Sequence, residues 1–193
     1  GIQTYWSIHS LLLQYLFLTA FVLLLLGNLA AEAQATFDLS VPTGIGFIHI
    51  PLKVTQVNSQ PMAIDTIGDF YDALGGAANV SFITTYDTSV GVWRSYLGDQ
   101  SNGTAADRTI TDDLGIITVM KNAVTLTFGG NALGTNGTSA MMLNRGTNLV
   151  GVPLDDQRLT RVSDLFALQG IQGNATAIIV LDPNDGIFKV VAQ

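Results

Sequence analysis

Two patterns of apolar residues divide the chain. Residues 11–26 are continuously apolar apart from Gln14 and Thr19, and no proline interrupts them. Leucine and alanine favour helix, so we expect one continuous helix over about residues 3–33. After residue 36, apolar and polar positions alternate in short segments, as they do in half-buried β-strands. The pattern therefore predicts an α+β protein, with a long N-terminal α-helix followed by a β-rich globular head.

The predicted N-terminal helix is apolar over most of its length. At 1.5 Å per residue it would be roughly 45–50 Å long, which exceeds the ~30 Å hydrocarbon core of a membrane. An apolar surface of this kind is unstable in water, and either lipid or neighbouring helices must cover it. The apolar side chains that need such cover include Leu11, Leu12, Leu13, Leu16, Phe17, Phe21, Leu24 and Leu25.

The head contains an internal repeat. Segment 44–52 aligns with segment 146–154, since both begin with Gly and end with Pro-Leu. Segment 79–87 aligns with segment 174–182, since both begin with Asn and end with Asp. Blocks that recur in the same order are stronger evidence for a repeat than one match alone. We therefore expect the two halves of the head to superpose.

Each half is predicted to contain two strands, a short helix and a β-hairpin. In the first half these elements are expected at 37–41, 45–52, 67–74, 80–86 and 92–97, with further strands at 115–120 and 124–128. In the second half the helix is expected at about 162–168 and the hairpin strands at 176–181 and 187–192. The glycine- and asparagine-rich segment 129–138 separates the halves. We therefore expect an N-terminal helix 1–35, repeat one at 36–130 and a shortened repeat two at 131–193.

The C-terminal hairpin is expected to leave one sheet edge open. Repeat one continues with two strands after its hairpin, and repeat two has no equivalent of them before Gln193. An exposed apolar edge pairs readily with another strand. We expect repeat one or a neighbouring subunit to cover this edge.

Composition excludes several classes of function. The chain has no Cys, which excludes thiolate catalysis and a Cys-ligated zinc site. Eight Lys and Arg against 15 Asp and Glu give a formal net charge of −7, which opposes binding to nucleic acid. The two histidines, His9 and His49, leave little room for a His-ligated metal. We expect no cofactor.

The remaining motifs are explained better by structure than by catalysis. Residues 44–46 begin like a dinucleotide loop, but a strand is expected after them instead of a helix. Residues 182–186 resemble the start of a calcium loop, but no Glu follows Glu32 to complete it, so a hairpin turn is favoured. The acid pairs 112–113 and 155–156 lie beside predicted loops, where solvation is favoured over Ca²⁺ binding. We predict that the protein is not an enzyme.

Two surface features suggest contact with sugars. The aromatic side chains Tyr86, Trp93 and Tyr96 surround the first hairpin and would offer a face for stacking on a sugar, although core or cross-strand packing is the favoured interpretation. Four N-x-[ST] sequons provide candidate glycosylation sites at Asn79, Asn102, Asn136 and Asn174.

The layout of residues 1–35 resembles that of the type IV pilin superfamily. The first basic residue is Lys53 and the chain starts with Gly1, as expected where a basic leader is removed directly before an apolar helix. In pilins this helix first anchors the subunit in the membrane and is later buried against copies of itself. Bacterial pilins usually carry Glu at the fifth position, which is Tyr5 here. Archaeal pilins lack that Glu and have β-rich heads, so the resemblance is closer to them.

The resemblance implies a pilin, the structural subunit of an extracellular filament on the cell surface. Its partners would be many copies of itself, and the membrane before assembly, with adhesion among the roles of such filaments. Residues 1–35 would then be an assembly helix, whose copies contact one another through its eight Leu and Phe side chains at positions 11, 12, 13, 16, 17, 21, 24 and 25. The alternative is a single-pass membrane-anchored module that binds surface glycans. A third interpretation is a signal peptide, since residues 33–35 resemble an A-x-A cleavage site.

Overall fold

The computed structural model describes residues 35–192 apart from 112, 133–141, 152–160, 169–170 and 182–187. The contacts within the chain divide it after Ala33, and Gln34–Gln193 form one compact unit. The predicted boundary between repeats at residue 130 stays a prediction. In the described ranges no helix is both long enough and apolar enough to cross a membrane.

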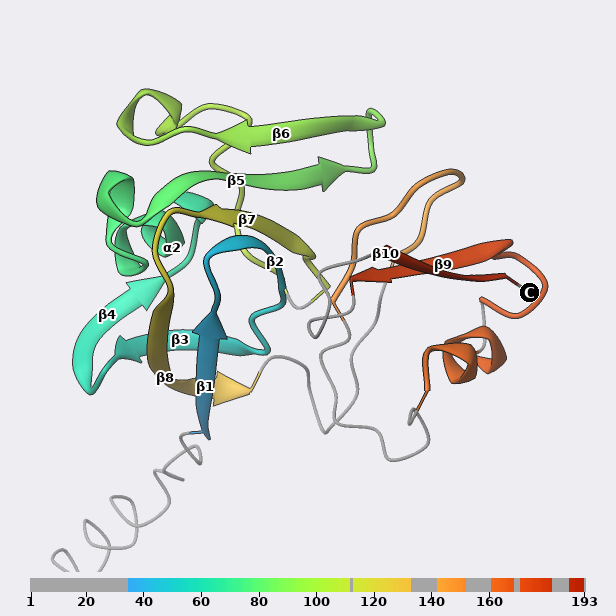
Figure 1. Cartoon of the computed structure of the whole chain (residues 1–193), viewed down its shortest axis with the longest axis horizontal. Helices are drawn as coiled ribbons and strands as arrows, with labels where there is room; N and C mark the ends of the chain where they lie inside the picture. The colour runs from blue at the N-terminus through green and yellow to red at the C-terminus, as the bar shows by residue number, and fades with distance from the viewer. Residues whose placement is uncertain are drawn as a thin grey trace, which may run out of the picture. The chain divides into compact units, whose positions relative to one another are not determined.

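The described residues form three antiparallel sheets (Figure 1). The first has the strand order β1-β8-β3-β4, made by Ala35–Val41, Val124–Ala132, Leu52–Val57 and Gln60–Ile64. The second has the order β2-β7-β5-β6, made by Gly44–Ile48, Ile116–Met120, Val80–Asp87 and Val92–Tyr96. The third is the hairpin of β9 and β10, made by Ala177–Leu181 and Phe188–Ala192. Between the strands lie helix α2 and the 3₁₀ turns η1, η2 and η3, at Ile67–Ala73, Gly76–Ala78, Asp99–Ser101 and Val162–Ala167.

The predicted α+β class is wrong. The described residues are mainly antiparallel β-sheet, and α2 is the one α-helix of seven or more residues among them. Side chains in the head alternate between buried and exposed positions, a period of two that suits strands and not helices. The expected helix over residues 3–33 and its eight assembly contacts lie outside the described residues.

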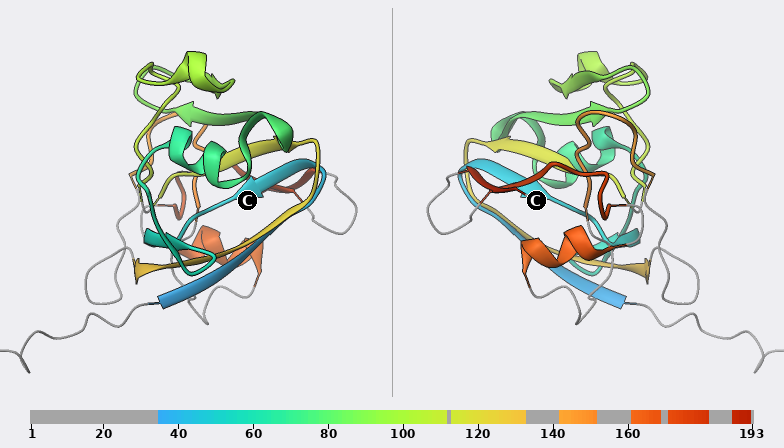
Figure 2. Two further views of the ribbon diagram at one scale, coloured as in Figure 1. Left: turned by 90° about the vertical axis from the view of Figure 1, so that its left-hand side faces the viewer. Right: turned by 90° about the vertical axis from the view of Figure 1, so that its right-hand side faces the viewer.

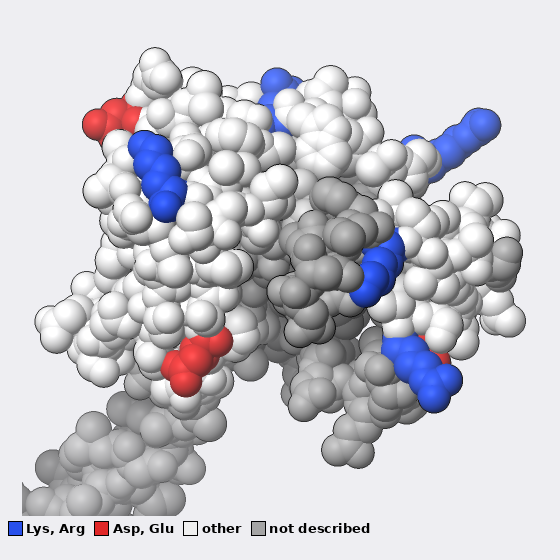
Figure 3. Space-filling model, viewed as in Figure 1, with Lys and Arg blue, Asp and Glu red and all other residues white. Residues whose placement is uncertain are grey.

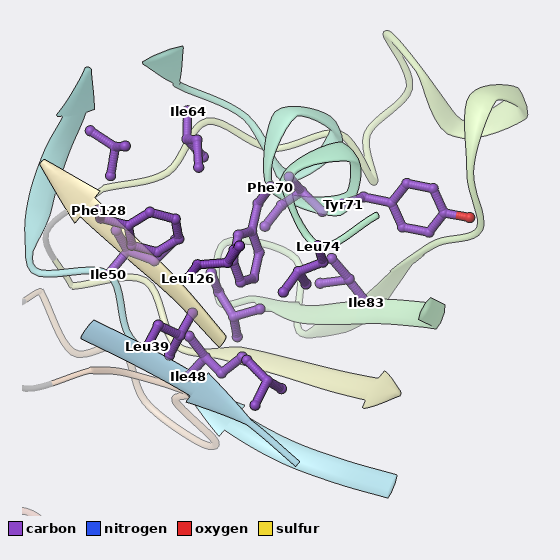
Figure 4. Close-up of a cluster of buried hydrophobic side chains, with 14 of the residues drawn as sticks. Leu39, Ile48, Ile50, Ile64, Phe70, Tyr71, Leu74, Ile83, Leu126 and Phe128 are labelled. Atoms are coloured by element: carbon purple, nitrogen blue, oxygen red, sulfur yellow. The ribbon is translucent and has the colours of Figure 1, made fainter. Parts of the chain in front are cut away.

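The two four-stranded sheets and α2 share one hydrophobic core (Figure 4). Phe70 from α2 meets Phe128 from β8 edge to face, with ring centroids 6.4 Å apart, and both side chains are fully buried. Ile83 from β5 adds a side chain from the second sheet to the same cluster. Figure 2 shows the strands of both sheets from either side, with α2 placed against them. The core therefore fixes one sheet relative to the other.

Helix α2 begins at a capping box. Thr66 is the N-cap, and its hydroxyl accepts a hydrogen bond from the backbone N–H of Asp69 at 3.3 Å. The Asp69 carboxylate in turn accepts from the backbone N–H of Thr66 at 2.9 Å. This exchange satisfies donors that the first turn of a helix leaves unpaired. The helix ends before Gly75, whose φ of +94° is the left-handed conformation that favours glycine.

The two hairpins pair in the same register. The cross-strand pair Ile83–Tyr96 of the first hairpin recurs as Ile178–Val191 in the second, with both members shifted by 95 residues. The helical segments correspond at the same shift, because the Asp164 carboxylate accepts from the N–H of Arg161 at 2.8 Å, just as the Asp69 carboxylate accepts from the N–H of Thr66. The hairpins therefore match in register, and the helical segments begin with the same contact, although α2 is an α-helix and η3 is a 3₁₀ turn.

The segments 44–52 and 146–154 do not match as expected. Gly44–Ile48 is a strand, whereas residues 146–149 have no regular structure, and Val150 makes an isolated bridge to Leu114. Strand β2 pairs with β7 along its whole length, but the later segment meets only the residues just before β7. Too few ladder hydrogen bonds form there to make a strand.

Candidate interaction surface

The outer face of the β2-β7-β5-β6 sheet is the candidate functional surface. The register places Phe82, Val119 and Ile45 side by side across three strands, and Thr84, Ile117 and Phe47 side by side in the next row. Tyr86 and Trp93 form a third row. Because successive side chains of a strand point to opposite faces, these rows share one face. We define the outer face by Ile45, Phe47, Phe82, Thr84, Tyr86, Trp93, Ser95, Ile117 and Val119.

The opposite face of this sheet is the core face. Ile83, Ile116 and Tyr96 lie on it and are buried. The outer face differs because three large apolar side chains remain open to water: Ile45 is 52% exposed, Trp93 51% and Phe47 37%. Val90, in the turn of the β5–β6 hairpin, is also exposed. Apolar patches of a few hundred Å² on a protein surface are often functional.

No charged residue interrupts the outer face. Figure 3 shows that Lys, Arg, Asp and Glu side chains are few and scattered on the side of the molecule that it displays. The nearest ion pair joins Arg94 and Asp87 at 3.6 Å, at the end of the β5–β6 hairpin. A hydrogen bond from the Ser89 hydroxyl lowers the pKa of Asp87, and the Arg108 and Arg94 charges lower it further. The charged pair of Arg94 and Asp87 therefore lies at the border of the outer face.

Tyr86 and Trp93 form an aromatic pair on the outer face. Their ring centroids are 4.9 Å apart with an interplanar angle of 60°, an edge-to-face arrangement. The Tyr86 carbonyl accepts a hydrogen bond from the Arg108 guanidinium at 2.8 Å, which holds the strand from the side. The exposed Trp93 ring therefore packs against Tyr86, whose backbone is held by Arg108.

Core or cross-strand packing, the favoured interpretation of the three aromatic residues, is confirmed, since Tyr86 pairs with Trp93 across the strands and Tyr96 lies in the core. Tyr96 is buried on the core face, and its ring lies 5.2 Å from the ring of Tyr71. Trp93 and Tyr96 are three residues apart on one strand, so strand alternation places them on opposite faces. The sequence contained this signal. It also contained the spacing by two residues of Ile45 and Phe47 and of Ile117 and Val119, which places each pair on one face and so indicates the rest of the outer face.

The polar groups around Tyr96 have structural roles. The Tyr96 hydroxyl donates to the Asn102 side-chain oxygen, and Asp107 accepts from the backbone N–H groups of Gly68 at 2.8 Å and Gly103 at 3.2 Å. Burial raises the pKa of Tyr96 to about 12, and nearby carboxylates, Asp107 first, add to the effect. These bonds tie the loop after β6 to α2. The described part of the chain holds no cluster of three or more His, Cys, Asp or Glu residues that would bind a metal ion.

The sequons differ in their surroundings. The Asn79 side-chain amide donates to the Leu74 carbonyl at 2.8 Å and so closes the end of α2. Asn102 is exposed although its side-chain oxygen bonds Tyr96, and Asn174 is exposed as well. Asn136 lies outside the described residues. All four remain predictions as glycosylation sites.

The structure accounts for other predicted positions. Residues 44–46 belong to strand β2, as expected for a segment that is not a dinucleotide loop. The His49 ring packs against the backbone of Gly151. Asp113 accepts a hydrogen bond from the Thr111 hydroxyl at 2.8 Å. His9, Asp112, the pair 155–156 and the segment 182–186 lie outside the described residues.

No protein-family model matches this chain, and neither a curated protein nor a solved structure matches it. The functional assignment therefore depends on the outer face and on the sequence.

Proposed function

We propose that the protein is a structural subunit of an extracellular filament, in which many copies of the chain associate. The observation that carries this proposal is the outer face, a four-stranded apolar surface without a charged residue. Water-exposed apolar area of this kind is removed most simply by a second protein surface. The apolar run at residues 11–26 supplies further area for contact between copies, and for a membrane before assembly.

The area of the outer face limits how strongly it can bind another copy by itself. Four strands spaced about 4.8 Å apart, with about five residues each at 3.3 Å, cover roughly 300 Å². A stable interface buries about 800 Å² on each partner. The outer face therefore orients neighbouring heads but does not hold a filament together by itself. Most of the association energy must come from a second contact, for which the apolar N-terminal run is the largest candidate.

Electron microscopy with matched variants tests this proposal. The intact chain should form filaments, and Phe47→Asp should prevent or disorder them, because an unpaired carboxylate is costly to bury. Ser40→Glu is the control, since Ser40 is exposed on β1 of the other sheet. Circular dichroism checks that the head remains folded in both variants. The absence of filaments from the intact chain, or normal filaments from Phe47→Asp, would contradict the proposal.

Glycan recognition is a second candidate function, favoured by the aromatic pair. An exposed Trp ring held by a neighbouring Tyr is suited to stacking on the apolar face of a sugar. In this case Trp93→Ala should abolish retention on immobilised polysaccharides. Ile45→Ala, on the same face but without an aromatic ring, should leave retention unchanged. Equal retention of both variants would exclude sugar stacking by Trp93.

A further inference from the structure

The edge of β9 that faces away from β10 is unpaired in the described residues. Since Ile178 and Val191 take the places of Ile83 and Tyr96, strand β9 corresponds to β5 and β10 corresponds to β6. The free edge of β9 therefore corresponds to the edge of β5 that faces away from β6.

That edge of β5 is occupied in the first repeat. Strand β7 pairs with it in antiparallel register, with Phe82 opposite Val119 and Thr84 opposite Ile117. The first repeat thus shows which kind of strand fits beside a strand of this type. It is an extended segment with apolar residues at most positions and Thr118 at its centre.

Strand β9 has none of the usual protection of a sheet edge. Its sequence is Ala-Ile-Ile-Val-Leu, which contains no charge, no proline and no glycine. Natural edge strands normally carry such residues because an unprotected edge pairs with other chains. Among the described residues, the next strand position at this edge is therefore open to an incoming strand.

Packing around the second hairpin is consistent with a missing strand. Ile83 and Tyr96 are almost fully buried in the first repeat, whereas their counterparts Ile178 and Val191 are half-buried. The helical segments differ in the same way, because Phe70 is fully buried and its counterpart Leu165 is half-buried. In the first repeat, Ile116, Thr118 and Met120 of β7 close the core on this side.

We propose that the free edge of β9 binds an extended β7-type strand supplied by a neighbouring polypeptide. The incoming strand pairs with β9 through backbone hydrogen bonds, and its alternate apolar side chains cover Ile178 and Val180. Strand β7 itself is not the donor, because β2 and β5 occupy both of its edges. This inference does not depend on the proposed filament function, since it concerns a different surface.

A synthetic peptide with the β7 sequence 115–121, Gly-Ile-Ile-Thr-Val-Met-Lys, tests the proposal. Binding of the labelled peptide to the full chain is measured by fluorescence anisotropy. Two further peptides carry N-methyl groups at alternate amides, one at odd and one at even positions. Successive amides of a strand point to opposite sides, so only one of the two should lose edge pairing. That peptide should bind about tenfold more weakly or worse, and the other should bind like the parent.

Hydrogen exchange locates the bound peptide. Amides of β9 should gain protection when the peptide is added, whereas those of β10 should not. Ile179→Lys and Val190→Lys are matched variants on one exposed face of the hairpin, and both should retain binding within about threefold, since edge pairing uses the backbone. The proposal is overturned if no peptide binds, if both methylated peptides bind equally, or if both lysine variants abolish binding. Slow exchange at the free edge of β9 in the monomer alone would also overturn it, because the chain would then cover the edge itself.

Discussion

Replacement of Phe128 by Leu tests the core that joins the two four-stranded sheets. Phe128 is fully buried at the centre of β8 and meets the ring of Phe70 at 6.4 Å. The smaller side chain leaves part of its volume empty, which costs about 1–2 kcal/mol in transfer and cavity terms. The lost edge-to-face contact adds about 0.5–1.5 kcal/mol. We therefore expect the free energy of unfolding to fall by about 2–3 kcal/mol.

The double variant separates the ring contact from the cavity. Phe70→Leu removes the same contact from the other side, so the double variant should be less than additive by about 0.5–1.5 kcal/mol. Phe47→Leu is the matched control, because Phe47 lies on the outer face and is 37% exposed. It should cost less than about 0.5 kcal/mol.

Urea unfolding, followed by circular dichroism, measures the free energy of unfolding of the parent chain and of the four variants. Equal costs for Phe128→Leu and Phe47→Leu would refute the assignment of core and outer face. Strict additivity of the Phe70 and Phe128 changes would refute their contact.

Three further predictions concern single sites. Burial holds the pKa of Tyr96 at about 12, so its neutral phenol should contribute its full stability below pH 10. This contribution should be lost as the pH rises through 12. Absorbance at 295 nm follows the ionisation of Tyr96, and unfolding curves at each pH follow the stability. The lowered pKa of Asp87 should rise in Ser89→Ala, and carboxyl NMR titration measures it; an unchanged value would mean that the Ser89 hydrogen bond is not its cause. Gly130→Ala should prevent folding, because the new methyl group would overlap the Lys53 carbonyl oxygen, and a normal yield of folded protein would contradict the close approach of β8 and β3.

The sequence alone determined the local elements of the head. The first hairpin was expected at 80–86 and 92–97 and is found at Val80–Asp87 and Val92–Tyr96. The short helix is predicted at 67–74, and α2 is found at Ile67–Ala73. No element is predicted between residues 52 and 67, but β3 and β4 form a hairpin there, turning at Asn58 and Ser59 with positive φ angles. The alternation of Leu52 and Val54 with Lys53 and Thr55, followed by the turn-forming Asn58, carried a signal for it.

The tertiary structure alone decided how these elements are shared between sheets. One strand was expected over 45–52, but β2 ends at Ile48 and β3 begins at Leu52, and the two lie in different sheets. Each finds its partner far along the chain, since β2 pairs with β7 and β3 pairs with β8. Periodicity reports which face of a strand is apolar, because that depends on neighbouring residues. It does not report which strand lies beside it, because that choice follows from how all the apolar faces close one core.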